Sequence, residues 1–416
     1  MYHHQGIRLA FLRKSKKITQ KEIAEQNYIA RTHLSNFENG RDNLSEDNCK
    51  SVAKFFGVGE AYFKIEVLNP IVLERLLSLA KKMLNNDFEQ IKETVAELKR
   101  TKMTFNERMS GYLLIAAYHY RFFQYDEAKS IEASFLDHIV PNINLEYATK
   151  EFKMFFNIYL MEKNVMSRDY KMALEACSNL LNLNLTSKEK AILQLERTYL
   201  LRHAGAVEES LILLKKTISY IEFINERKLL VEAYTYLSVT YSILNLVQYQ
   251  LSALEKLETL AKEFDIPIRL AMAYQHRGRI SFKNKDYKQA LKYYNDAEGL
   301  IEFPERNPLL QISLITVLIK LGNYKEAKLK INTSRNYPLS EYEEMCLLSL
   351  ETEMFLYQGE IQRHKKNLKI VLNYFEETEE REDLIYNYDY LAEYYDSKGK
   401  YQEAAKYSKL WREIQK

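Results

Sequence analysis

Three polar residues are spaced in a way that suits the reading of DNA bases. Arg31, Thr32 and Asn36 fall on one side of a short helical pattern, and the apolar residues Leu34 and Phe37 fall on the other. Arginine can donate two hydrogen bonds to guanine, asparagine can pair with adenine, and the threonine methyl can contact thymine. These residue types predict contacts with base edges in the major groove. The alternative is that some of them are simply exposed surface.

Positive charge gathers next to these residues. Residues 1–66 carry 11 Lys/Arg and 8 Asp/Glu, whereas the rest of the chain carries 49 of each and is neutral. Clustered cations on a small domain suit contact with the phosphate backbone. We therefore predict that Lys14, Lys16 and Lys17 contact phosphates, and that Asn43 reaches a phosphate from the following loop. A solvated helix face is the alternative.

The elements that must position these side chains lie in residues 18–40, which read as two short helices joined by a tight turn. Thr19 can cap the first helix, because its hydroxyl can accept a hydrogen bond from a free backbone N–H. Gly40 can end the second, where the chain needs a positive φ. Such a pair presents its second helix to the major groove.

Helices expected on either side complete a module of five helices. Its sequence resembles the lambda-repressor-like (XRE) DNA-binding family over about residues 5–66, through TQKEIA, LSNFENG and VAKFFGV. The resemblance implies that Gln20 begins the helix that rests on the phosphate backbone. It also implies that Arg31, Thr32 and Asn36 occupy the base-reading positions.

Two residues depart from the family pattern. Tyr28 stands where the family usually has the turn glycine, so we expect Asn27 to take the left-handed conformation and shift the turn by one residue. Ala30 stands at the usual Ser/Thr cap of the second helix, so that cap is either absent or supplied by a neighbour.

From residue 70 the chain repeats a pattern of two helices with a small residue at a fixed place. Aligned copies put this position at residues spaced 37 to 45 apart: Ile91, Ala128, Ala173, Ser210, Ala253, Ala290, Ala327, His364 and Ala404. The pattern resembles the tetratricopeptide (TPR) family, in which two helices cross closely at the small residue. We therefore predict an all-α chain with a DNA-binding domain at 1–66. Residues 67–416 should form a right-handed superhelix of about nine helical pairs with a concave inner face.

The first helix of each pair should line that inner face. Projection from the repeat register places a set of polar side chains there, which can hold an extended peptide through its backbone amides and terminal carboxylate. Each residue taken singly could instead be a solvated surface residue. The set is Arg121, Asn157, Arg202, Ser238, Gln275, Arg279 and Lys283.

The last pair, residues 381–416, is rich in tyrosine and contains Trp411. A terminal repeat must cover its open face, so pairing with a second chain is one interpretation. Ordinary packing of the repeat core explains most of these rings equally well.

Other kinds of site have little support in the sequence. Cys49, Cys177 and Cys346 lie far apart without metal-ligand spacing, which fits buried thiols in a reducing cytosol. We find no nucleotide-binding loop, zinc-protease motif or nucleophile elbow, and expect neither enzymatic activity nor a cofactor. No apolar run is long enough to span a bilayer, and the N-terminus does not read as a secretory signal.

The order of the parts resembles the RRNPP peptide-pheromone receptors, and its length is most similar to the NprR-like branch. This resemblance implies a cytoplasmic quorum-sensing transcriptional regulator that binds operator DNA as a homodimer or higher oligomer. A short signalling peptide would bind the TPR groove and change its conformation or oligomer state. The alternative is a TPR regulator that sequesters a response regulator or another protein, with DNA binding secondary.

Overall fold

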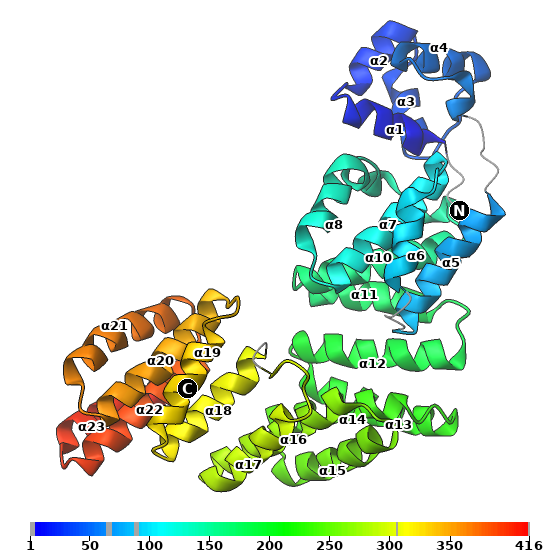
Figure 1. The fold of residues 1–416 in the computed structure, drawn as a ribbon. Helices are drawn as coiled ribbons and strands as arrows, with labels where there is room; N and C mark the ends of the chain where they lie inside the picture. Colours follow the sequence, from blue (N-terminus) through cyan, green and yellow to red (C-terminus); the bar gives the residue numbers. More distant parts are fainter. Residues whose placement is uncertain (1–4, 64–68, 87–90, 305–306, 415–416) are drawn as a thin grey trace. The chain divides into compact units, whose positions relative to one another are not determined.

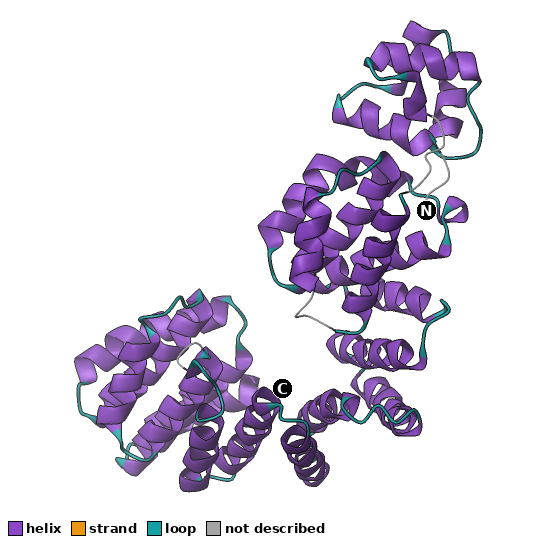
Figure 2. Ribbon diagram, turned by 45° about the vertical axis from the view of Figure 1, so that its right-hand side comes forward, coloured by secondary structure: helices purple, strands orange, loops and turns teal. Residues whose placement is uncertain are grey.

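The computed structural model describes residues 5–63, 69–86, 91–304 and 307–414. All regular structure in these ranges is helical (Figures 1 and 2). By compactness the chain divides into two units, residues 1–236 and 237–416. The predicted all-α fold class is confirmed. The predicted domain boundary at 66/67 lies outside the described residues and stays a prediction.

The N-terminal module consists of four α-helices and a closing 3-10 turn. These are α1 (Gly6–Ser15), α2 (Gln20–Asn27), α3 (Arg31–Glu38), α4 (Glu46–Phe56) and η1 (Glu60–Phe63). Their shared core contains Leu9, Ile23, Leu34, Phe37 and Val52, all at most 1% exposed. Leu34 and Phe37 therefore face inward as predicted, which turns the opposite side of α3 to solvent.

Helix α2 begins as its sequence predicts, but the turn at its C-terminal end differs from the prediction. Thr19 and Glu22 form a reciprocal capping box at the N-terminus. Tyr28 itself takes the left-handed conformation at φ 55°, so the expectation that Asn27 would do so is wrong. The Asn27 side chain is buried instead, donating to the carbonyl of Ile23 and accepting from Ser51. These two bonds hold Asn27 in the helix and leave Tyr28 to make the turn.

Nine helical pairs follow in the described residues, as predicted. In the first unit they are α5 (Pro70–Leu84) with α6 (Ile91–Arg100), α7 (Phe105–Arg121) with α8 (Tyr125–Ile131), α10 (Lys150–Met166) with α11 (Tyr170–Leu181), and α12 (Ser187–His203) with α13 (Val207–Phe223). The next pair is α14 (Leu229–Ile243) and α15 (Val247–Glu263), and the boundary between the units falls within α14. The second unit continues with α16 (Pro267–Lys283) and α17 (Tyr287–Glu298), α18 (Pro308–Lys320) and α19 (Tyr324–Ser334), α20 (Glu341–Tyr357) and α21 (Ile361–Glu377), and α22 (Arg381–Ser397) and α23 (Tyr401–Ile414).

One pair carries an irregular extension. After α8 the chain forms a π-turn, η2 (Glu132–Leu136), and then α9 (Asp137–Ile139), η3 (Val140–Asn142) and η4 (Leu145–Tyr147). This extension accounts for the longest spacing in the sequence repeat, from Ala128 to Ala173.

The small-residue positions are buried where each second helix begins to cross its partner, mostly at the fourth residue of the helix. Ser210 and His364 fit there because each donates a hydrogen bond to the first helix of its pair. Ser210 donates to the carbonyl of Thr198, and His364 donates to the carbonyl of Thr352. The predicted position at Ala253 is wrong, since the fourth residue of α15 is the buried Gln250.

Within each unit the first helices of successive pairs pack on one another, as α7 does on α10 and as α18, α20 and α22 do in series. These first helices form a layer. We call the surface of this layer that points away from the second helices the first-helix face. The turns that join the two helices of a pair need positive φ, which glycine adopts readily. Gly205, Gly322, Gly359 and Gly399 supply it at four of these turns, whereas bulkier residues such as Phe123 and Arg168 supply it elsewhere.

Candidate nucleic-acid interface and repeat face

The predicted base-reading residues share the solvent side of α3. Arg31 and Thr32 open the helix and Asn36 lies one turn on, and all three side chains are exposed. Ala30 precedes them without making a side-chain cap, so the backbone N–H groups at the start of α3 are not capped by that side chain. The arrangement leaves the N-terminal end of α3 accessible to a ligand, as a recognition helix requires.

A basic hollow joins α3 to the start of α2. It is lined by Ile18, Thr19 and Gln20 together with five cations, Arg13, Lys14, Lys17, Lys21 and Arg31. No acidic residue lines it among the described residues. The N-terminus of α2 adds the positive end of its helix dipole. This combination suits a phosphate group next to the base-reading helix.

The cations predicted to contact phosphates are not equivalent. The Nζ atom of Lys14 donates to Asn142 at 2.7 Å, and burial together with the nearby Arg13 lowers the pKa of Lys14. The Nζ atom of Lys16 donates to the carbonyl of Phe56 at 2.9 Å and lies over its ring. Lys17 is exposed, with no such bond among the described residues. Of the three, Lys17 is the best placed for DNA.

Polar contacts also fix Gln20 and the loop after α3. Gln20 donates to Glu38 at 2.8 Å, and the guanidinium of Arg13 donates to the same carboxylate at 2.7 and 2.8 Å. This hydrogen bonding raises the pKa of Arg13. The exposed Asn43 follows Asp42, whose carboxylate accepts the N–H of Asn43. Glu38, which the sequence did not single out, therefore orients Gln20 at the edge of the hollow.

The predicted peptide-binding residues separate into buried and accessible groups. Asn157 is 3% exposed, donating to the carbonyl of Lys153 and accepting from Asn179, and Ser238 is fully buried. We predicted that both would line the inner face. That prediction is wrong for these two side chains, because both point into the packing between helices. Gln275 is half-buried, while Arg279 and Lys283 are exposed.

The Arg121 guanidinium is largely occupied by hydrogen bonds within the protein. It donates to Glu162 on the next first helix, to the carbonyl of Met83 and to Asn86. Burial alone would lower the pKa of Arg121, but Glu162 and Glu196 outweigh it and raise the pKa. Burial also raises the pKa of Glu196, despite the opposing effect of Arg121. Arg121 thus connects three helical pairs, and no local pattern indicated the roles of Glu162 and Glu196.

Arg202 has a different environment. Its guanidinium lies 5.5 Å from the ring centroids of both Tyr199 and Tyr236. Burial is the main cause that lowers the pKa of Arg202. Within the part of the chain that the structure describes, its N–H groups meet no acceptor. A stacked and half-buried guanidinium of this kind suits a carboxylate or a backbone carbonyl of a ligand.

In the second unit, Arg279 forms an ion pair with Glu382 of α22 at 3.2 Å, and Lys285 forms one with Glu393 at 2.7 Å. Both pairs are exposed and join residues about a hundred positions apart. Exposed pairs contribute little stability, so a ligand could replace either at small cost.

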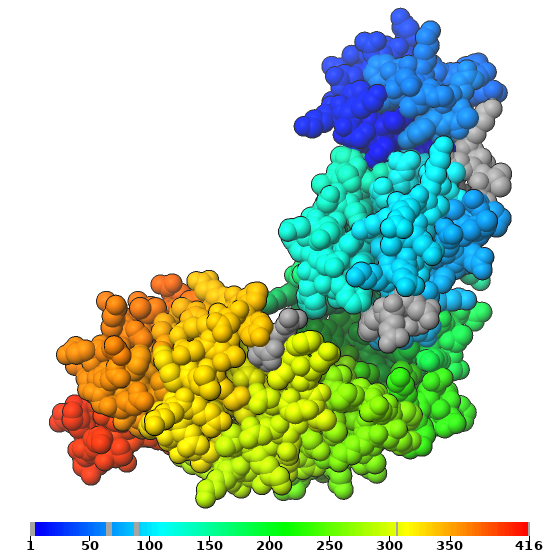
Figure 3. Space-filling view, viewed as in Figure 1, coloured from blue at the N-terminus to red at the C-terminus, as the bar shows by residue number. Residues whose placement is uncertain are grey.

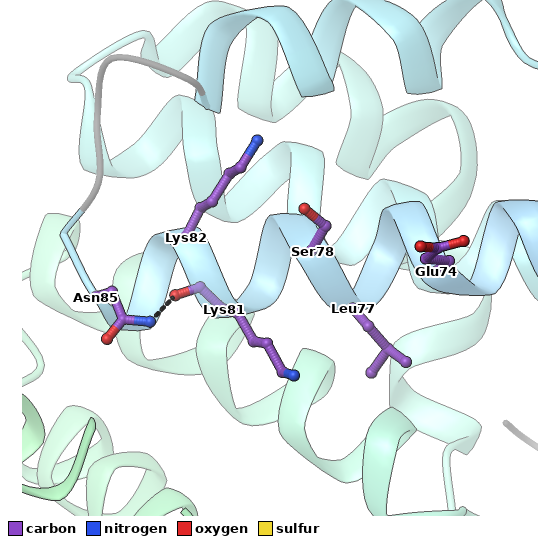
Figure 4. A pocket seen from close by; sticks show the side chains of 6 residues that line it. All are labelled: Glu74, Leu77, Ser78, Lys81, Lys82 and Asn85. Carbon is purple, nitrogen blue, oxygen red and sulfur yellow. Dashed lines mark hydrogen bonds between the residues drawn. The ribbon is translucent and has the colours of Figure 1, made fainter. Parts of the chain in front are cut away.

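A further hollow follows one face of α5 (Figure 4). Its described lining comes from that helix alone: Glu74, Leu77, Ser78, Lys81, Lys82 and Asn85. Lys82 already donates to Thr94 on α6, and Asn85 to its own helix. No convergent set of polar groups makes it a site. The described residues also contain no His/Cys/Asp/Glu group that could hold a metal ion, and no helix suited to span a membrane.

Comparison with known families identifies the N-terminal module. The model of a family described as a helix-turn-helix domain matches residues 6–64. These residues form a helix-turn-helix domain. Over 51 residues the chain is 39% identical to the HTH-type transcriptional activator BcrR of Enterococcus faecalis, a match that covers 12% of this chain and 25% of that protein. The chain thus matches only about a quarter of that relative's length.

The repeats resemble solved structures over most of the chain. The apo form of RapI is 16% identical with a TM-score of 0.61, covering 83% of this chain and 97% of its own. The apo quorum sensor NprR from B. thuringiensis is 18% identical with a TM-score of 0.56, covering 83% and 99%. NprR in complex with its cognate peptide NprX is 17% identical with a TM-score of 0.53, covering 84% and 99%. The chain has the helical-repeat fold of these proteins.

Proposed function

We propose that this protein is a cytoplasmic transcriptional regulator that binds operator DNA through α3 and a short signalling peptide on its first-helix face. The observation that carries the proposal is the combination in one chain of an exposed recognition helix beside a basic hollow and a repeat array with the NprR fold. NprR has been solved with a peptide, which makes a peptide the first ligand to test. A homodimer would give two DNA-binding domains for a palindromic operator.

On the first-helix face, Arg202 is our candidate for ligand contact in the first unit. Gln275, Arg279 and Lys283 are separate candidates within the second unit. Arg202 would bind a carboxylate of the peptide, because its guanidinium lies over two rings and has no hydrogen-bond acceptor among the described residues. Arg121, Asn157 and Ser238 would support the face from within. Peptide and DNA would then change each other's affinity by the same factor.

The DNA half of the proposal is tested by selecting bound sequences from a random duplex pool. We expect the wild-type protein to enrich a defined site, and Arg31→Ala to lose preference at one or two base pairs at about 1–3 kcal/mol each. Lys216→Ala, an exposed cation on α13, is the matched control and should keep the preference. Failure of the wild type to enrich any sequence would reject operator recognition and favour the protein-sequestering alternative.

The peptide half is tested by calorimetry with peptides encoded by small open reading frames next to the gene. Arg202→Ala should weaken binding at least tenfold, since it removes a charge-assisted contact in a partly desolvated place. Lys216→Ala should leave affinity unchanged. Equal binding by wild type and Arg202→Ala would move the site elsewhere on the array.

A further inference from the structure

The first helix of the DNA-binding domain belongs to two cores at once. Leu9 and Leu12 pack in the core of the helix-turn-helix domain. Ile7, on another side of the same helix, packs in the core of the first repeats. Helix α1 also packs on η2 and α9, the irregular extension after α8. Figure 3 shows the N-terminal module, in dark blue, against the cyan and teal surface of the first repeats. One rigid element is therefore shared between the DNA-binding domain and the array.

Aromatic side chains fill the space between α1 and the extension. The ring of Phe11 lies 4.8 Å from that of Phe135, 5.5 Å from that of Phe105 and 6.1 Å from that of His138. Phe105 and Phe135 also contact each other at 5.5 Å. Such ring contacts each contribute beyond their buried area. Phe11 thus inserts into a cluster built by the repeats.

Two cations close the edges of this contact. Arg8 is 2% exposed, its guanidinium lies over the rings of Tyr62 and Phe105, and it donates to the carbonyl of Tyr62. Lys14 also joins α1 to the extension, because it donates to Asn142 at the end of η3. Both cations belong to the basic N-terminal segment, so part of that charge serves this contact rather than DNA.

The extension is itself firmly held. Glu132, the first residue of the π-turn, is 1% exposed and accepts from Tyr159 at 2.6 Å. Its carboxylate also pairs with Lys129 and Lys163, both at 2.8 Å. A π-turn alters the regular α-helical placement of side chains, and Phe135 lies within this one. The bonds of Glu132 therefore hold in place the segment whose residues contact α1.

We propose that residues 132–142 form a socket that locks the DNA-binding domain to the first repeats as one rigid body. The socket contacts α1 and leaves Arg31, Thr32 and Asn36 exposed, so docking is compatible with DNA binding. A movement of the first repeats then carries the recognition helix with it. The role of the socket as a transmitter of peptide binding rests on the proposed function, but the docking itself does not.

The docking is tested by electron–electron spin distance measurements in the full chain, without ligand or DNA. Nitroxide labels are placed at two exposed positions, Glu25→Cys on α2 and Lys171→Cys on α11, in a Cys49→Ala background that leaves only the buried Cys177 and Cys346. We expect one narrow distance distribution. Phe11→Ala, which removes the inserted ring, should at least double its width.

Phe55→Ala is the matched control, since this exposed ring lies on α4, which packs on α2 and η1. It should leave the width unchanged. His138→Ala tests the socket from the repeat side, so a folding defect of α1 cannot explain a result seen in both variants. A broad distribution in the parent protein, or an unchanged width in Phe11→Ala and His138→Ala, would overturn the proposal while leaving the proposed function standing.

Discussion

Glu38 is buried in the helix-turn-helix domain with two partners. It is 2% exposed, and its carboxylate receives two hydrogen bonds from Arg13 and one from Gln20. Through these bonds one residue of α3 fixes the end of α1 and the start of α2. The orientation of the recognition helix against the basic hollow depends on it.

We expect Glu38→Ala to lower the stability of this domain by about 3–5 kcal/mol, because it leaves the Arg13 guanidinium partly buried without its carboxylate. Hydrogen exchange of the α3 amides measures the effect. Glu25→Ala, which removes an exposed carboxylate paired with Lys21, should change it by less than about 1 kcal/mol. Equal exchange in the two variants would show that the buried pair does not stabilise the domain.

Single residues also show how far the site could be predicted. The exposure of Arg31, Thr32 and Asn36 followed from the inward positions of Leu34 and Phe37, because helical periodicity is a local property. The role of Asn27 did not follow, since its partner Ser51 lies 24 residues away. The contact of Arg202 with Tyr236 was missed for the same reason, because the two residues lie on different helices.

At the scale of elements, close crossing of paired helices depends on positions without a side chain. Gly278 of α16 is such a position: an added Cβ would lie 2.6 Å from the Tyr294 ring of α17. Tyr294 is 5% exposed and packed among buried residues. The α16–α17 pair therefore has no room for a methyl group there.

We expect Gly278→Ala to destabilise the second unit by about 1–3 kcal/mol through overpacking, partly offset by up to about 1 kcal/mol of helix propensity. Urea unfolding followed by the fluorescence of Trp411, the sole tryptophan, reports on this unit. Gly299→Ala is the control, because its added Cβ meets nothing closer than 3.6 Å. If both variants unfold at the same urea concentration, the close approach at Gly278 is relieved without cost.

The π-turn after α8 should make the first unit sensitive to acid. Burial alone would raise the pKa of the Glu132 carboxyl, but hydrogen bonds from Lys129, Lys163 and Tyr159 outweigh it and lower the pKa to about 2. A depressed carboxyl pKa stabilises the folded state above the unfolded value of 4.5, and this contribution is lost as the pH falls from there toward 2.

We therefore expect wild type to exceed Glu132→Gln in stability by roughly 3 kcal/mol at pH 7, with the difference shrinking below pH 4.5. Urea unfolding of both proteins between pH 7 and pH 3 measures it. The exposed Glu127→Gln on α8 should show no such trend. A difference that stays constant with pH would mean that Glu132 stabilises the turn through packing rather than charge.

For the whole molecule, we expect DNA affinity to depend more on where the cations lie than on the net charge. Of the cations in the N-terminal segment, Arg8, Arg13, Lys14 and Lys16 are bonded within the protein. Lys17 remains exposed beside the basic hollow. Non-specific DNA affinity should therefore depend on fewer cations than the net charge suggests.

We expect Lys17→Gln to make the slope of log affinity against log salt less negative by about 0.9, as one phosphate contact is lost. Fluorescence anisotropy with a labelled random-sequence duplex at several salt concentrations measures it. Lys54→Gln, an exposed cation on α4, should leave the slope unchanged. An unchanged slope in Lys17→Gln would place the phosphate contacts on another face of the domain.

Local patterns along the chain were enough to predict the helices, the helix-turn-helix module and the nine helical pairs. Caps such as Thr19, the apolar period and the small residues at crossings act over a few positions, so they can be read along the chain. The packing of Gln250 at the crossing in α15, of Arg202 against Tyr236 and of Phe11 against Phe135 became apparent only in the folded chain. These features depend on contacts between residues far apart in sequence, for which local patterns carry no signal.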